Sequence, residues 1–197
     1  MTSDYNYYGI GEAPATFNEG DFVLTHQSAW TSRMIQIGQG IQFRGERRKF
    51  AYWNHAIWIA SSEGDIIEAV GKGVSRNTMD EYINQEYVVI HTDLDPENIA
   101  QGTAFVEAML HDGYGFVEII SIAFQLLTTL KVSLTYGDTI ICSALVARGL
   151  EHGGEIFDLN PYMIKPANLA ECYDITPPST IKPSIRQIKK RFELDEV

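Results

Sequence analysis

Two apolar segments joined by a short polar turn constrain the fold of this 197-residue chain more than any other feature. Residues 53–60 (Trp-Asn-His-Ala-Ile-Trp-Ile-Ala) and 66–70 (Ile-Ile-Glu-Ala-Val) are rich in the aromatic and β-branched residues that strands favour. The turn between them, residues 61–65, consists of Ser, Glu, Gly and Asp, which are typical of turns. The pattern therefore predicts an antiparallel β-hairpin.

The remaining patterns predict further strands and helices and, with the hairpin, an α+β fold. Strands are expected at residues 22–25 and 87–91, and residues 74–76 are expected to resume the second hairpin strand after glycines 71 and 73 interrupt it. Helices are expected at residues 29–39, 96–112 and 116–130, and from Thr139 to the Gly153–Gly154 pair. A capping box at residues 78–81 predicts a short helix, and the basic segment at 40–52 is expected to be a loop.

The length suits one domain flanked by two extensions. Residues 1–18 are polar and aromatic and are expected to form an N-terminal arm that lies on the domain. The domain itself spans residues 19–176. Residues 177–197 are punctuated by proline and then basic, which predicts a flexible C-terminal tail or a docking segment.

Charge and apolar runs exclude some classes of protein. The net charge is −11, with 15 basic and 26 acidic residues, which argues against nucleic-acid binding because phosphates require a basic surface. The longest apolar run, residues 116–130, is too short to span a bilayer, so no transmembrane segment is expected. No signal peptide is visible, which predicts a cytoplasmic protein or one exported by another route.

The helix expected from Thr139 carries Cys142, one of two cysteines. An apolar stripe at helical spacing comprises Cys142, Leu145, Val146, Gly149 and Leu150. With Thr139 or Asp138 as the cap, Cys142 lies in the first turn, where free N–H groups and the helix dipole favour a thiolate. The alternative is that Cys142 is a small apolar core residue. Cys142 and Cys172 are too few for a disulfide framework in a chain of this length.

A cysteine nucleophile needs a general base, and the base needs a polar partner that orients it. His55 is the candidate base because it opens a strongly apolar strand, where packing does not call for an imidazole. The other histidines end strands or lie near helix C-termini: His26, His91, His111 and His152. The alternative is that His55 is a hydrogen-bonded core histidine.

Glu68 is the candidate partner of His55. It lies inside the apolar second strand of the hairpin, where an unpaired carboxylate would be costly to bury. His55 on the neighbouring strand is one candidate partner, although the turn length leaves the register open. Arg76 or Lys72 is the structural alternative.

No cofactor or metal is expected. Cys142 and His55 lack the closely spaced ligand pairs that zinc sites usually show. The Gly71-Lys-Gly73 segment has the spacing of neither nucleotide-binding motif.

The order of these segments resembles the circularly permuted branch of the NlpC/P60 papain-like superfamily, the YiiX-like hydrolases. In that branch the histidine strand precedes the cysteine helix. The matching segments are Gly20-Asp-Phe-Val-Leu, the helix at 28–38, Asn54-His55-Ala-Ile-Trp-Ile, Ile67-Glu68-Ala-Val with Gly73-Val74, and Ile141-Cys142-Ser143-Ala-Leu-Val146. Weaker matches are Tyr114 and Pro166-Ala-Asn-Leu169, and the resemblance covers about residues 19–173.

The resemblance implies a permuted papain-like α+β fold, with a small antiparallel sheet packed against the nucleophile-bearing helix. It implies Cys142 as nucleophile, His55 as base and Glu68 as the residue that orients the imidazole. Backbone N–H groups at the start of the Cys142 helix would form the oxyanion hole, and Tyr114 is the candidate helper. The long basic insert at 40–52 and the short hairpin between His55 and Glu68 depart from the family pattern.

The implied activity is that of a cysteine peptidase or amidase that cleaves an amide or peptide bond through an acyl-enzyme, with peptidoglycan-type peptides as the first expected substrates. One alternative is a lipid or acyl ester or amide hydrolase, for which the 116–130 helix would line an acyl site rather than only pack in the core. Another is a catalytically silent binding module. A third is a toxin or phage-borne wall hydrolase, which would have an immunity or delivery partner.

Overall fold

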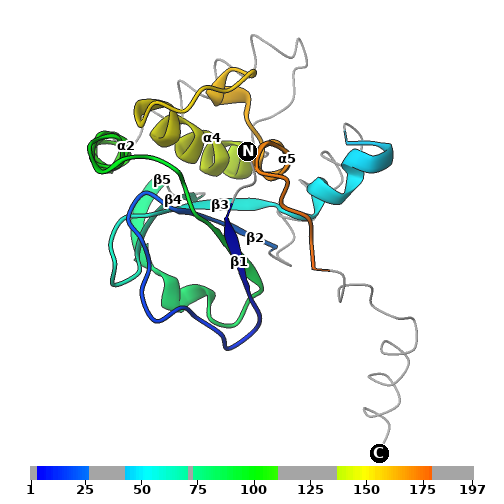
Figure 1. Ribbon diagram of the computed structural model, residues 1–197, viewed down its shortest axis with the longest axis horizontal. Helices are drawn as coiled ribbons and strands as arrows, with labels where there is room; N and C mark the ends of the chain where they lie inside the picture. Colours follow the sequence, from blue (N-terminus) through cyan, green and yellow to red (C-terminus); the bar gives the residue numbers. More distant parts are fainter. Residues whose placement is uncertain (1–3, 27–42, 71–72, 111–136, 179–197) are drawn as a thin grey trace, which may run out of the picture.

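A six-stranded antiparallel sheet forms the centre of the computed structural model, which describes residues 4–26, 43–70, 73–110 and 137–178 (Figure 1). Its strands are β1 (Tyr5–Tyr8), β2 (Phe22–Thr25), β3 (His55–Ile59), β4 (Asp65–Val70), β5 (Gly73–Thr78) and β6 (Tyr87–Ile90). They lie in the order β1-β6-β2-β3-β4-β5, and every neighbouring pair is antiparallel. Together with the helices, this sheet confirms the expected α+β class.

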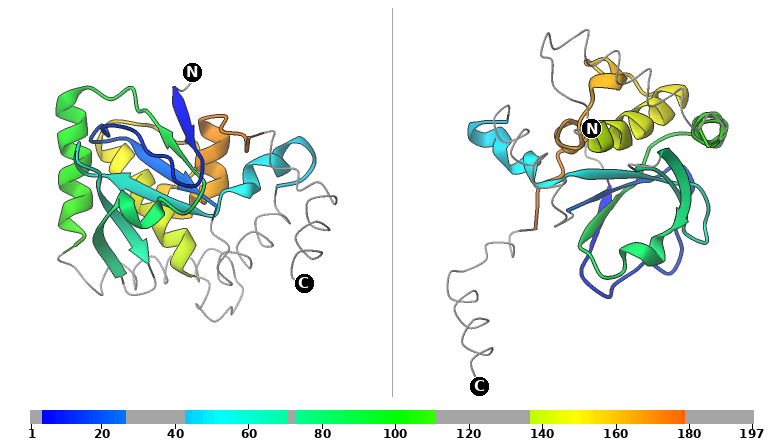
Figure 2. Two further views of the ribbon diagram at one scale, coloured as in Figure 1. Left: turned by 90° about the horizontal axis from the view of Figure 1, so that it is seen from below. Right: turned by 180° about the vertical axis from the view of Figure 1, so that it is seen from behind.

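Helices cover one face of the sheet. The described α-helices are α2 (Pro96–Ala108), α4 (Gly137–His152) and α5 (Pro166–Cys172), and the 3-10 helices are η1 (Gly45–Tyr52), η2 (Met79–Tyr82) and η3 (Pro161–Met163). In both views of Figure 2, α4 lies across the sheet with α2 and α5 on the same side. The opposite side carries η2 and the loop that precedes β2.

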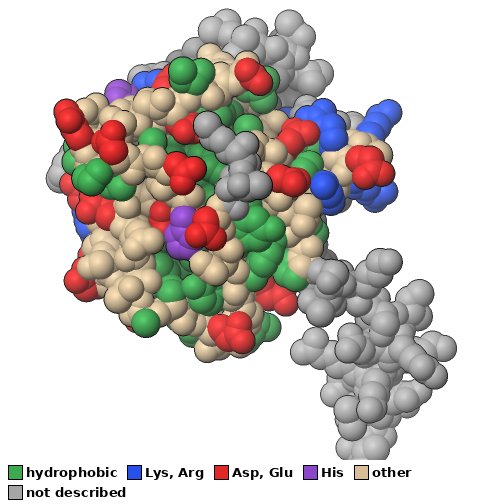
Figure 3. All heavy atoms as spheres, in the orientation of Figure 1, with side chains coloured by type: hydrophobic (Ala, Val, Ile, Leu, Met, Phe, Trp, Pro, Cys, Tyr) green, Lys and Arg blue, Asp and Glu red, His purple; other side chains and the backbone are tan. Residues whose placement is uncertain are grey.

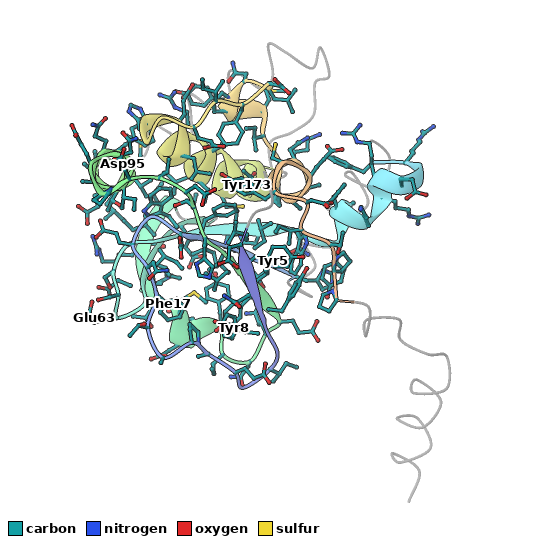
Figure 4. All side chains as sticks on the ribbon, viewed as in Figure 1. Tyr5, Tyr8, Phe17, Glu63, Asp95 and Tyr173 are labelled. Atoms are coloured by element: carbon teal, nitrogen blue, oxygen red, sulfur yellow. The ribbon has the colours of Figure 1, made fainter. Side chains whose placement is uncertain are left out.

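The sheet separates two hydrophobic clusters because the side chains of each strand alternate between its faces. The cluster under the helices includes Trp58, Ile67, Cys142 and Leu145. The cluster on the other face includes Ile57, Ile59, Ile66, Tyr82 and Tyr87. Figure 4 shows the same division, with Tyr173 on the α5 side of the sheet and Tyr8 and Phe17 on the η2 side.

Trp58 fixes how α2 and α4 approach the sheet. Its ring is fully buried, and its indole N–H donates to the Thr103 hydroxyl over 3.3 Å. Glycines leave room for it on both helices. A Cβ at Gly102 would lie 2.7 Å from the Gly149 carbonyl oxygen, and one at Gly149 would lie 2.9 Å from the Trp58 ring. The helix that carries Cys142, α4, is therefore held on β3 by close packing.

The start of α2 is as expected. Asp95 caps the helix by accepting a 3.0 Å hydrogen bond from the Asn98 N–H, and Pro96 occupies its first turn. The helix ends at Ala108 rather than at residue 112. Residues 79–82 form the expected short helical turn, but the Thr78 side chain makes no capping hydrogen bond, so the capping box is absent.

Two other expectations were wrong. Residues 73–78 do not resume β4 but turn back as its antiparallel partner β5, with Val70 opposite Gly73. The glycine at 73 has a φ of +112°, which residues with a Cβ rarely adopt, so it permits this tight reversal. The basic segment expected to be a loop contains the 3-10 helix η1 over residues 45–52.

The N-terminal arm supplies an edge strand, since β1 pairs with β6 over four residues. The tail from residue 179, the helix expected at 29–39 and the helix expected at 116–130 lie outside the described residues, and so does Tyr114. Within the described part of the chain, no helix combines the length and apolar character needed to cross a membrane.

Candidate active site

His55 begins β3 and is held there by the neighbouring strand. It lies opposite Thr25 of β2, and the backbone N–H of Asn54 donates to the Thr25 carbonyl over 3.2 Å. The His55 side chain is buried, with 8% of its surface exposed.

Glu68 lies in β4 and accepts three hydrogen bonds. Its Oε2 accepts from His55 Nε2 over 2.7 Å and from the Tyr82 hydroxyl over 2.5 Å. Its Oε1 accepts from Asn77 Nδ2 over 2.7 Å. Only 1% of the residue is exposed, so these bonds replace the water that an exposed carboxylate would bind. The expected contact between His55 and Glu68 is thus present, whereas Arg76 instead pairs with Glu107.

Cys142 lies in α4 and hydrogen-bonds the His55 ring. Because His55 Nε2 is taken by Glu68, the nitrogen left for the thiol is Nδ1. Cys142 and Glu68 thus both bond the His55 imidazole.

The contact between Cys142 and His55 crosses the sheet. Alternation places His55 and Glu68 on the same face as Ile57 and Ile66, whereas α4 packs on the opposite face. The strands β3 and β4 pair only at Trp58↔Ile67 and Ile59↔Ile66, so the ladder does not extend to the level of His55. The bond between Cys142 and His55 therefore lies at a level where β3 and β4 are not paired.

Cys142 does not lie where the sequence suggested within its helix. The first described helical residue is Gly137, so Thr139 and Asp138 are inside α4 rather than caps, and Cys142 falls in the second turn. The N–H groups that lack an intrahelical acceptor belong to the first turn. The expected placement beside free N–H groups was therefore wrong.

The contacts set the charge of His55 and Glu68. Burial alone would lower the pKa of His55, but the charges and hydrogen bonds of Cys142 and Glu68 outweigh it and raise the pKa from 6.5 to about 10. Burial alone would raise the pKa of Glu68, but the bonds from His55, Tyr82 and Asn77 outweigh it and bring it below its ordinary 4.5. Near neutral pH the site therefore contains an imidazolium and a carboxylate.

The sequence did not identify Tyr82 and Asn77 as site residues. Burial, followed by the Glu68 charge, raises the pKa of Tyr82, so its hydroxyl remains a neutral donor. Asn77 is in β5, diagonally opposite Glu68, whose direct partner is Ser75. Had residues 73–78 been identified as the returning strand, the need of Glu68 for donors would have pointed to Asn77. No local pattern points to Tyr82.

The other sequence candidates lie elsewhere or are not described. His91 Nδ1 bonds Asp21 Oδ2 over 2.5 Å at the opposite end of β2, and His152 stacks on Phe105. His111, Lys72 and Tyr114 lie outside the described residues. Among the residues that the structure does describe, no group of three or more His, Cys, Asp or Glu side chains is arranged to hold a metal ion.

The basic insert forms a projection beside the site. Figure 3 shows Lys and Arg side chains gathered over η1, which precedes His55 in the chain. The projection is tied to α5 and the turn after it: Arg47 forms a bidentate pair with Glu171, and Lys49 lies 3.6 Å from Asp174. These contacts explain part of the basic cluster structurally.

The three site residues are closed off from solvent. Cys142 has no exposed surface, and His55 and Glu68 are almost fully buried. Cys172, by contrast, is exposed, and the pKa of its thiol is raised by partial burial and by the charges of Glu171, Asp158 and Glu155.

Comparisons with known proteins add no assignment. No protein-family model matches the chain, and neither a curated protein nor a solved structure matches it.

Proposed function

We propose that the chain is a cysteine hydrolase of the circularly permuted papain-like NlpC/P60 type, which cleaves an amide or peptide bond through an acyl-enzyme. The observation that carries this proposal is that the His55 ring bonds both the Cys142 thiol and the Glu68 carboxylate. The chain order supports it as well, since the histidine strand and the glutamate strand precede the cysteine helix that packs on them.

In the proposed reaction, the Cys142 thiolate attacks the carbonyl carbon of the substrate. His55 then donates its Nδ1 proton to the leaving nitrogen, the C–N bond breaks, and a thioester forms on Cys142. In the second half, neutral His55 removes a proton from water, which attacks the thioester and releases the acid. Glu68 keeps the Nε2 proton in place throughout and stabilises the imidazolium.

The proposal assigns no oxyanion donor to the start of α4, because Cys142 lies beyond the first turn of that helix. The substrate class comes from the resemblance: peptidoglycan-type peptides are the first substrates to test. Lipid or acyl esters and amides are the second class.

The test is to incubate the full chain with cell-wall peptides and with acyl esters, and to follow both product release and the mass of the intact protein. We expect product from cell-wall peptides and a thioester adduct on Cys142, both lost in Cys142→Ala. Cys172→Ala is the matched control and should retain the activity, since Cys172 is an exposed residue outside the Cys142, His55 and Glu68 site.

Turnover of acyl esters alone would overturn the peptide assignment in favour of the lipid class. If folded protein consumes neither substrate, or if Cys142→Ala retains the activity, the hydrolase proposal is wrong and the binding-module alternative replaces it.

A further inference from the structure

Tyr82 contacts the oxygen of Glu68 that also holds the imidazole. It ends η2, on the sheet face opposite α4, and its hydroxyl donates to Glu68 Oε2 over 2.5 Å. The same oxygen accepts from His55 Nε2 over 2.7 Å. The rings of Tyr82 and His55 also stack, with centroids 6.3 Å apart and planes 14° apart.

A second buried tyrosine shows what a purely structural hydroxyl does in this core. Tyr87 belongs to the same hydrophobic cluster as Tyr82, and it donates to the backbone carbonyl of Glu12 over 3.0 Å. A neutral backbone acceptor satisfies a buried hydroxyl. Tyr82 differs because its acceptor is the carboxylate that bonds the candidate base.

The donors around Glu68 hold both of its oxygens. Tyr82 and His55 share Oε2, while Asn77 holds Oε1, so the carboxylate can neither rotate nor exchange its oxygens without breaking a bond. A hydrogen bond to an ionised acceptor is stronger than one between neutral groups and favours the ionised form. The position of the His55 ring follows from the position of this carboxylate.

We infer that Tyr82 is a positioning residue of the proposed hydrolase: through its bond to Glu68 it keeps that carboxylate ionised and aimed at His55, and so sustains the pairing of His55 with Cys142. Asn77 supports the same carboxylate from β5. The inference rests on the proposed function. It assigns Tyr82 no contact with the substrate.

The titratable groups that face this network come from three elements: His55 from β3, Cys142 from α4, and Tyr82 with the adjacent exposed Glu81 from η2. If Tyr82 loses its hydroxyl, Glu68 loses one donor and takes up a proton at a higher pH. His55 then loses its negative partner, and the Cys142 thiolate should disappear at a higher pH as well.

The experiment is a pH titration of the ultraviolet absorbance of the Cys142 thiolate, measured as the difference between each variant and the same variant carrying Cys142→Ser. It needs neither substrate nor access of a reagent to the buried thiol. For Tyr82→Phe we expect the midpoint of the absorbance change at low pH, where the thiolate takes up a proton, to shift to higher pH by about one unit or more. Asn77→Ala should move it in the same direction by less, because water can replace a half-buried donor.

Tyr87→Phe is the matched control, since it removes a hydroxyl from the same cluster that does not bond Glu68. Its titration curve should coincide with that of the unaltered chain. Circular dichroism at each pH confirms that the variants are folded. The inference is overturned if the titration curve of folded Tyr82→Phe coincides with that of the unaltered chain, whatever Asn77→Ala does. It is also overturned if Tyr87→Phe shifts the midpoint equally. If the unaltered chain has no thiolate near neutral pH, the proposed function itself fails.

Discussion

Replacing Glu68 by alanine is expected to lower the free energy of unfolding by about 3–5 kcal/mol, as the loss of one partner from a buried ion pair usually does. The substitution leaves His55, Tyr82 and Asn77 without the acceptor that all three now use. Because the residue is almost fully buried, water does not readily take its place. Denaturant unfolding near pH 6 measures the change.

Glu107→Ala is the matched control for this substitution. Glu107 is also paired, with Arg76, but both side chains are more than 40% exposed. An exposed pair of this kind contributes between 0 and about 1 kcal/mol. If Glu68→Ala costs no more than Glu107→Ala, the three bonds to Glu68 do not stabilise the fold as described.

The effect of Glu68→Ala should depend on pH. The lowered pKa of Glu68 gives a stabilisation that is present above 4.5 and is lost as the pH falls through its folded-state pKa. The raised pKa of His55 gives a stabilisation that is complete below 6.5 and is lost as the pH rises towards about 10. The difference between the unaltered chain and the variant should therefore be largest between these ordinary values, at about pH 4.5–6.5.

If the proposed hydrolysis is correct, replacing His55 by alanine is expected to slow it roughly 1000-fold, within the range that a positioned acid–base group contributes. In the proposed reaction, His55, which interacts with the Cys142 thiol, both donates and takes up a proton. Its loss removes the imidazolium that favours the thiolate and the donor for the leaving nitrogen. The rate constant for release of product measures the effect.

His91→Ala provides the control for His55→Ala. His91 is likewise hydrogen-bonded to a carboxylate, that of Asp21, but it lies at the other end of β2. Its removal should change the rate by no more than about twofold, since it touches none of the reacting groups. If folded His55→Ala retains the rate, or if His91→Ala loses as much, His55 is not the base.

The expected burial of Glu68 made the contact between His55 and Glu68 predictable from the sequence. A carboxylate inside Ile-Ile-Glu-Ala-Val needs a partner, and the neighbouring strand offered His55; the 2.7 Å bond confirms that contact. The strands predicted at residues 22–25 and 87–91 and the start of α2 could be recognised from short stretches of sequence. In each case the residues at the boundary are themselves typical of the start or end of such an element.

Tertiary contacts determined what the sequence did not predict. Asp138 and Thr139 have the side chains of helix caps, yet α4 includes both. Arg47 anchors η1 to Glu171, which is 124 residues away, so no short window shows the helix. Tyr82 reaches Glu68 only because β5 turns back on β4 and η2 folds under the sheet.

The pairing of the Cys142 thiolate with the His55 imidazolium is the central claim, and a pH titration of thiolate absorbance tests it most directly. A Cys172→Ser background removes the exposed thiol, whose raised pKa would otherwise add a signal at high pH. We predict a thiolate absorbance in the unaltered chain while His55 is protonated, and its loss in His55→Ala. A folded protein whose Cys142 ionises like an ordinary thiol, whether or not His55 is present, would contradict the claim.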